Sequence, residues 1–328
     1  MIGFYMNKSN DSQPMRGWDT YWEGTRDAEA YASGGVSHPV VASFWDSALT
    51  EHLAARDSGK LLDIASGSGK VVERLVQQSG TQNFEVTCVD ISDAAIDVVR
   101  SRFPNIVGVV ADAKSIPLDS GQYDLVTSQF GIEYAGLAAI DEATRLLAPD
   151  GALILLMHIQ PGVIFRECTI ALDAIERTQK CKFMPLSLRF FECGFAAVRG
   201  ADRAPYDQAA LQFNPAIQEL ESILSDYGEH VAGDTISKLY SDVQQIHNRM
   251  QYYNPDDVLG WLRTMDKELS EYEERMASMC EAAIDDKTFS DVCENLRGQG
   301  FNIVKEEPLL AANDELPIAW ILCASRSN

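Results

Sequence analysis

Cysteine and histidine are sparse in this sequence of 328 residues, and neither is clustered. The seven cysteines never form a Cys-x-x-Cys pair, so we expect free thiols in a reducing compartment rather than a disulfide framework. The five histidines are isolated, and we predict no metal site. No apolar run approaches the roughly 18 residues of a membrane helix, and the N-terminus lacks the apolar core of a signal peptide. These absences predict a cytoplasmic protein that does not enter a membrane.

Basic side chains are also few, because 27 Lys and Arg stand against 49 Asp and Glu and leave a formal net charge of -22. The excess of acid extends over both halves of the chain, and no basic stripe interrupts it. Such a surface repels phosphate backbones, which excludes nucleic acids and anionic membranes as partners. Hydrophobic residues make up 46% of the chain, enough for a sizeable core.

Short apolar runs alternate with helical patterns in the first half of the chain, as in βαβ units. The expected strands are 60–65, 84–91, 105–112, 123–130 and 152–159, and the expected helices are 36–56, 70–78, 92–103 and 137–151. The chain then becomes almost continuously helical, with segments near 163–180, 206–227, 230–250 and 255–283, before a helix at 291–301 and strands at 302–308 and 318–325. We therefore predict an α/β fold, a Rossmann-like seven-stranded, mostly parallel sheet with a large helical insertion before the last two strands.

This order divides the chain into four parts: an N-terminal arm or lid at 1–35, a core at 36–160, a helical cap or substrate insertion at 161–288, and a return to the core at 289–328. Pro215 and Pro255 follow asparagines, as at first helical turns. Long amphipathic helices also pair between subunits, so we expect a monomer or a homodimer formed through the insertion.

The loop after the first strand, in LLDIASGSGKVVERL (61–75), has the most informative pattern. Gly67 and Gly69 allow the backbone to approach a ligand, and the amides that open the next helix favour a carboxylate or a phosphate. Val72 stands where a dinucleotide fingerprint has its third glycine, and a phosphate loop of the Walker type needs Ser or Thr at Val71. Asp63 before the glycines is an acceptor suited to an amine or to fixing the loop. A ligand with an amino acid moiety satisfies both features.

Acidic residues also end the next two strands. Asp90 is placed to accept hydrogen bonds from both hydroxyls of a ribose, and Asp112, next to Ala113, is placed to receive the exocyclic amine of an adenine. In an open parallel sheet the ligand lies beyond the carboxyl ends of the strands, beside the switch point. The three aspartates together predict a nucleoside with an amino acid end.

These motifs, with VVADAKSIPL, YDLVTSQF and LLAPDGALILLMH, resemble those of class I S-adenosylmethionine-dependent methyltransferases over about residues 58–160 and the closing strands. The resemblance implies that the cofactor is S-adenosylmethionine and that its site includes Asp63, Ala65, Ser66, Gly67, Gly69, Asp90, Ile91, Asp112, Ala113 and the backbone of Gln129. Ser66 departs from the Gly or Cys that is frequent there. In this family an N-terminal arm often folds over the cofactor, so Tyr21 and Trp22 are candidates to contact the sulfonium and Arg26 to pair with the methionine carboxylate; packing of the rings onto the core is the alternative.

Three polar residues are candidates to act on the methyl acceptor. Glu133 and Tyr134 follow the fourth strand, and His158 ends the fifth, where a general base for a hydroxyl, thiol or carboxyl group is expected. Each also has a structural interpretation, as a helix cap, a packed ring or a hydrogen-bonded strand end. The Ser-Gln-Phe-Gly segment before Glu133 differs from the Asn/Asp-Pro-Pro-Tyr/Phe segment of adenine-N6 methyltransferases. Enzymes that methylate arginine in proteins typically use two glutamates in one loop, and only Glu133 is present here. Both observations count against these two classes of methyltransferase.

The sequence thus predicts an enzyme that moves a methyl group to O, N or S of a small molecule by in-line displacement. A cofactor-binding protein without catalysis, whose helical region binds a partner, and a protein methyltransferase remain the alternatives.

Overall fold

The computed structural model describes residues 38–54, 56–79, 83–311 and 316–326. The predicted arm at 1–35, with Tyr21, Trp22 and Arg26, lies outside the described residues. The chain divides into two compact units, one of residues up to Arg166 and from Ser278 onward, the other Glu167–Ala277. The second unit falls within the insertion expected at 161–288.

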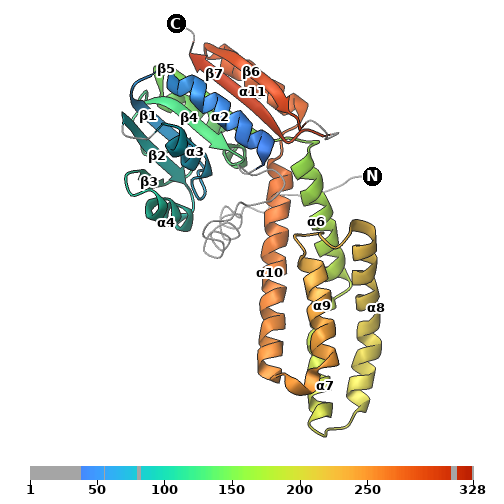
Figure 1. Cartoon of the computed structure of the whole chain (residues 1–328). Helices are drawn as coiled ribbons and strands as arrows, with labels where there is room; N and C mark the ends of the chain where they lie inside the picture. Colours follow the sequence, from blue (N-terminus) through green and yellow to red (C-terminus); the bar gives the residue numbers. More distant parts are fainter. Residues whose placement is uncertain (1–37, 55, 80–82, 312–315, 327–328) are drawn as a thin grey trace. The chain divides into compact units, whose positions relative to one another are not determined.

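The first unit is built on a seven-stranded sheet of order β3-β2-β1-β4-β5-β7-β6 (Figure 1). Its strands are β1 (Gly59–Ile64), β2 (Phe84–Asp90), β3 (Val107–Val110), β4 (Tyr123–Gln129), β5 (Leu147–His158), β6 (Phe301–Leu309) and β7 (Ala319–Arg326). The first five strands pair in parallel, and β7 pairs antiparallel with both β5 and β6. The predicted fold class is confirmed, and the carboxyl ends of β1, β2 and β4 meet at one edge.

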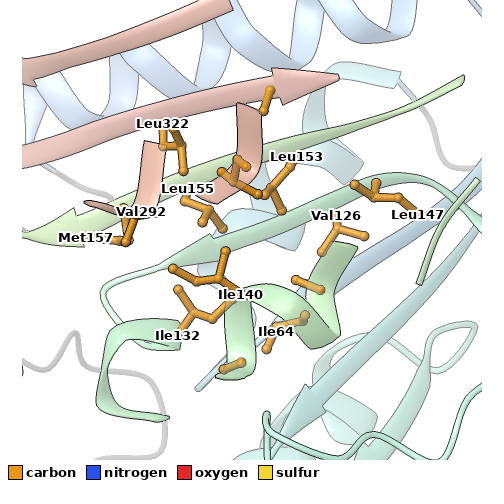
Figure 2. Packing of buried hydrophobic residues seen from close by; sticks show 14 of the residues in the cluster. Ile64, Val126, Ile132, Ile140, Leu147, Leu153, Leu155, Met157, Val292 and Leu322 are labelled. Atoms are coloured by element: carbon orange, nitrogen blue, oxygen red, sulfur yellow. The ribbon is translucent and has the colours of Figure 1, made fainter. Parts of the chain in front are cut away.

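Helices cover both faces of this sheet: α2 (Pro39–Ala54), α3 (Lys70–Ser79), α4 (Asp93–Arg102), α5 (Leu137–Leu146) and α11 (Asp286–Gly298), with a 3-10 turn η2 (Ile132–Ala135). Figure 2 shows the main core, in which Ile64, Val126 and Leu155 of the strands pack with Ile140 of α5 and Val292 of α11. These side chains are 3% exposed or less, and burying each contributes roughly 1.5–3 kcal/mol.

The structure corrects several predicted boundaries, and two of them have a clear physical cause. The helix expected at 137–151 ends at Leu146, and β5 begins at Leu147 instead of at residue 152 because Leu147 already pairs with Tyr123 of β4. The last helix begins at Asp286, earlier than expected, since the side chain of Asp285 accepts a 2.7 Å hydrogen bond from the Thr288 amide. The cap predicted at Ser92 is confirmed, because its hydroxyl accepts from the Ala95 amide.

The second unit consists of helices that run side by side in Figure 1. They are α7 (Phe183–Val198), α8 (Ala204–Tyr227), α9 (Thr235–Asn248), the 3-10 turn η3 (Met250–Tyr252) and most of α6 (Val163–Lys180) and α10 (Pro255–Ala282). The sequence did not separate α7 from its neighbours. The first-turn assignment holds for Pro255 but is wrong for Pro215, which lies inside α8.

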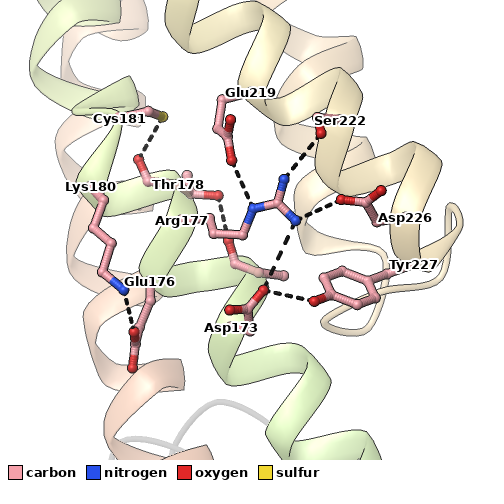
Figure 3. Close-up of polar contacts among 11 residues, drawn as sticks. Asp173, Glu176, Arg177, Thr178, Lys180, Cys181, Glu219, Ser222, Asp226 and Tyr227 are labelled. Carbon is pink, nitrogen blue, oxygen red and sulfur yellow. Dashed lines mark hydrogen bonds and ion pairs between the residues drawn. The ribbon is translucent and has the colours of Figure 1, made fainter.

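Arg177 of α6 ties two helices of this unit together (Figure 3). Its guanidinium donates to Glu219 at 2.7 Å, to Asp226 at 2.8 Å and to Ser222 at 3.1 Å, all on α8. These acceptors raise the pKa of Arg177, so the charge is permanent. The three hydrogen bonds from this one guanidinium therefore fix the alignment of α6 along α8.

Both ends of the insertion join the sheet unit beside β5. Ile159 forms a parallel bridge with Ile284, whose amide donates to the His158 carbonyl at 2.9 Å. The indole of Trp320 in β7 donates to the Ile284 carbonyl at 3.0 Å and stacks on Phe289 at 4.1 Å. The helical segment therefore leaves and re-enters at the carboxyl end of β5, the edge that carries the loops described next.

Candidate cofactor and active site

The loop after β1 is held in a conformation that favours glycine. Gly67 and Gly69 have φ of 51° and 77°, and even Ala65 has a φ of 53°, in the left-handed region that L-residues rarely occupy. A β-carbon at Gly69 would lie 3.1 Å from the Phe103 ring. The Gly69 amide donates to the Ser66 carbonyl at 2.8 Å, which tightens the turn into α3. The strain at Ala65 is typical of a loop shaped for a ligand.

Asp63 ends β1 in an environment unfavourable for a carboxylate. It is 3% exposed, Oδ1 accepts from the Thr127 hydroxyl at 2.8 Å, and Oδ2 is buried without a partner among the described residues. Burial raises the pKa of Asp63 to about 7; the Thr127 hydrogen bond opposes this rise, and the neighbouring Asp90 charge adds to it. A bound cation would restore the charged form, so the arrangement fits the amine predicted from the sequence.

Asp90 at the end of β2 organises the same loop. One carboxylate oxygen accepts from the Gly67 amide and the other from the Ser92 amide, both at 2.9 Å. Each oxygen can accept a second hydrogen bond, so the side chain can also take the ribose hydroxyls predicted for it. Ile91 follows and is 40% exposed, an apolar surface beside the predicted ribose site.

Asp112 lies two residues beyond the end of β3, which is shorter than the predicted strand at 105–112. Its side chain is exposed, and Oδ1 accepts from the Lys114 amide at 2.9 Å, so the carboxylate closes its own turn. Ala113 packs against the core. The other carboxylate oxygen of Asp112 is the one that suits an exocyclic amine.

The loop after β4 lies against the loop after β1. Phe130 has a φ of 52°, and Gly131 is so close to Ala65 that a β-carbon there would overlap the alanine side chain. The side-chain oxygen of Gln129 accepts a hydrogen bond from the indole of Trp45, a fully buried residue of α2. The backbone after β4, predicted to meet the methionine end of the cofactor, is thus anchored from α2.

The three candidate residues for acceptor chemistry lie together. Oε1 of Glu133 accepts from the His158 backbone amide at 2.8 Å and lies 2.6 Å from Nδ1 of the imidazole. The side chains of Glu133 and His158 are 0% and 2% exposed. The rings of Phe130 and Tyr134 pack on the imidazole at 4.7 Å and 5.7 Å between centroids. Glu133 thus lies beneath His158 rather than at the surface.

Sequence reasoning missed Thr127, Trp45 and Phe130. Thr127 and Trp45 occur in runs that read as ordinary strand and helix, and their partners Asp63 and Gln129 lie far away in the chain. The neighbouring Gly131 was the one local signal that the backbone at Phe130 turns sharply.

No group of three or more His, Cys, Asp or Glu in the described part of the chain is arranged to hold a metal ion. The seven cysteines all lie in the described part of the chain and form no disulfide with one another. No helix among the described residues is both long and apolar enough to cross a membrane.

Comparison with known proteins finds similarity to methyltransferases. Residues 61–151 match the family model described as "Methyltransferase domain". A protein of Schizosaccharomyces pombe named "Uncharacterized methyltransferase C25B8.09" is 27% identical over 49% of this chain, which spans 61% of that relative's length. "Ubiquinone/menaquinone biosynthesis C-methyltransferase UbiE" of Ectopseudomonas mendocina is 27% identical over 60% of this chain and 73% of its own. The crystal structure of a SAM-dependent methyltransferase from Aquifex aeolicus shares 17% identity at a TM-score of 0.32, covering 35% of this chain and 64% of that one.

The chain carries the nucleoside-binding domain of an S-adenosylmethionine-dependent enzyme. Residues 61–151 are similar to a methyltransferase domain, as the sequence predicted, and the relatives named as methyltransferases support S-adenosylmethionine as the cofactor. The glycine loop, the unpartnered oxygen of Asp63 and the carboxylate of Asp90 fit the amino acid and ribose parts of that cofactor.

Proposed function

We propose that the chain methylates a small molecule at a carbon or oxygen atom that becomes nucleophilic when the acceptor loses a proton. The observation that carries this proposal is the buried pair of Glu133 and His158. Glu133 lies in the turn η2 after β4, and His158 is the last residue of β5. A carboxylate on one nitrogen of an imidazole is an arrangement suited to general base catalysis.

The contact with Glu133 sets the roles of the two imidazole nitrogens. A carboxylate can only accept, so we assign the hydrogen of the ring to Nδ1, and Nε2 is then the nitrogen that acts as the base. The acceptor gives its proton to Nε2, and the Glu133 carboxylate stabilises the imidazolium that results. Phe130 and Tyr134 hold the plane of the ring. Bound S-adenosylmethionine supplies an electrophilic methyl group on a sulfonium sulfur.

The relatives extend the acceptor atoms beyond the O, N or S expected from the sequence. Several are named as C-methyltransferases of ubiquinone and menaquinone biosynthesis. Reduced quinones carry ring hydroxyl groups, and removing such a proton raises the electron density on the neighbouring ring carbon. We therefore favour a hydroxylated aromatic or enolic acceptor, for which one base activates either the oxygen or the carbon.

We assign the choice of acceptor to the helical unit. The insertion that contains this unit begins just after β5, which ends at His158, and the chain pairs with this end of the sheet again at Ile284. Loops at this edge of an open α/β sheet customarily supply the substrate contacts.

The test uses the full chain with S-adenosylmethionine labelled in the methyl group, an extract of small metabolites, and a set of hydroxylated arenes and enols. We expect labelled product of low molecular mass, with the position of the methyl group read by NMR. Absence of labelled product with every small acceptor would refute the catalytic proposal, and label found only on trypsin-sensitive material would indicate a protein acceptor instead.

The role of the pair is tested with Glu133→Gln and His158→Gln. Glu133→Gln keeps an oxygen for the two donors but removes the charge that stabilises the imidazolium, so kcat should fall by roughly 100-fold or more while the KM for S-adenosylmethionine changes little. His158→Gln should lose activity at every pH. If Glu133→Gln keeps the wild-type rate and pH profile, Glu133 serves only to cap β5.

A further inference from the structure

Thr127 of β4 lies opposite Asp63 of β1 in the parallel register. Both are buried, at 5% and 3% exposure. The Thr127 hydroxyl lies 2.8 Å from Oδ1 of Asp63 and 3.3 Å from the Leu62 carbonyl. It has one hydrogen to donate, and the shorter distance directs that hydrogen to the carboxyl group. Thr127 therefore occupies Oδ1, and Oδ2 is the oxygen that remains for another ligand.

A small cavity lies beside Asp63, and none of the described residues that line it carries a positive charge. That lining is apolar apart from Asp63 and Thr127, and comes from α2, α3 and three strands. The titratable neighbours are Cys88 of β2, which pairs with Asp63 in the parallel register, and Asp90. Burial is the main cause that raises the pKa of Asp63, Asp90 adds to it, and the Thr127 hydrogen bond acts in the opposite direction.

A buried carboxyl group in this setting has two stable states: it carries a proton, or it faces a cation. The cation that the cofactor brings is the α-ammonium of its methionine part. We propose that Thr127 is a positioning residue, which holds Oδ1 of Asp63 so that Oδ2 exchanges its proton for the ammonium group when the cofactor binds. In this exchange the O–H bond of Asp63 breaks, the proton passes to solvent, and the ammonium keeps all its hydrogens. The inference rests on the cofactor of the proposed function.

Calorimetry of S-adenosylhomocysteine binding to the full chain tests the exchange, because the heats in two buffers of different ionisation enthalpy give the number of protons released. We expect wild type to release close to one proton at pH 6 and roughly a tenth of a proton at pH 8, with affinity rising towards neutral pH. Asp63→Asn should release none. Thr127→Val has the same shape without the donor, so it should still release about half a proton or more at pH 8. Thr127→Ser should behave as wild type.

Two results overturn the proposal. One is binding to wild type with no proton release at pH 6. The other is a Thr127→Val variant that binds more weakly by the same factor at both pH values, since that is the effect of a structural defect alone. Folded wild type that fails to bind S-adenosylhomocysteine at either pH would instead contradict the cofactor assignment.

Discussion

Ala65 and Gly131 bring the loops after β1 and β4 into direct contact. A β-carbon at Gly131 would overlap that of Ala65 and lie 3.2 Å from its carbonyl oxygen. Ala65 is itself held at a φ of 53°, so it has little freedom to move away. The two loops, both predicted to bind the cofactor, can therefore pack this closely only because Gly131 has no β-carbon.

Gly131→Ala should therefore lower the free energy of unfolding by about 1–3 kcal/mol and weaken S-adenosylhomocysteine binding by roughly tenfold or more. The matched control is Gly298→Ala in α11, where an added β-carbon has no atom within 4 Å. Adding Ala65→Gly to Gly131→Ala removes the overlap and should restore binding in part. Additive losses in the double variant, measured by urea unfolding and calorimetry, would contradict a direct clash.

Asp90→Asn should weaken S-adenosylhomocysteine binding by roughly 100-fold or more. The amide offers one oxygen to two backbone donors, Gly67 and Ser92, and its NH2 group opposes one of them. An analogue of S-adenosylhomocysteine that lacks one ribose hydroxyl distinguishes a disordered loop from a lost direct contact. Wild type should bind this analogue more weakly than S-adenosylhomocysteine, whereas Asp90→Asn should bind the two compounds equally. Unchanged affinity of Asp90→Asn would disprove the ribose assignment. Asp93→Asn, exposed in the first turn of α4, is the control.

The stability of the cofactor-free protein should depend on Asp63 through pH. Its pKa is about 7 when folded and near 3.8 when unfolded, so the folded state holds a proton that the unfolded state has lost between these values. Wild type then loses stability as pH rises from about 4 to 7, by about 4 kcal/mol in total. Asp63→Asn escapes this loss and should be the more stable protein in urea at pH 8, with little difference at pH 4. Asp57→Asn, at an exposed position, is the control variant. An equal gap for both variants would refute the assignment.

Arg177→Met should destabilise the helical unit by about 1–2 kcal/mol, because Glu219 and Asp226 lose the guanidinium between them. Amide hydrogen exchange in α6 and α8 measures the effect locally, and high salt should reduce the difference from wild type. Arg203→Met removes a side chain that is 75% exposed and pairs within one helix, so exchange should be unchanged. Equal effects of both substitutions would contradict a specific role for Arg177.

Parallel topology made much of the cofactor site predictable. Asp63 and Asp90 follow apolar runs whose carboxyl ends must meet at one edge, so their proximity follows from the order of the strands. The hydrogen bond between Thr127 and Asp63 did not follow, because it depends on the register of β1 against β4. The pairing of Glu133 with His158 likewise needs the 3-10 turn η2 to aim one side chain at the end of β5.

The errors at element boundaries have the same origin. Leu147 continues the apolar pattern of α5, but its pairing with Tyr123 recruits it to β5. Asn214 and Pro215 read as a helix start, yet Phe213 and Ala216 are buried on either side of them and packing carries α8 through the proline. In both cases a tertiary contact decided what local sequence left ambiguous.

The pairing of Leu155 in β5 with Leu322 in β7 has a consequence for synthesis of the chain. The first five strands leave the ribosome before the whole helical segment, and β7 emerges after it. Until then β5 presents an open edge, and the face later covered by Phe289 and Val292 is exposed to solvent. The sheet can therefore be completed only after the whole helical segment has been synthesised.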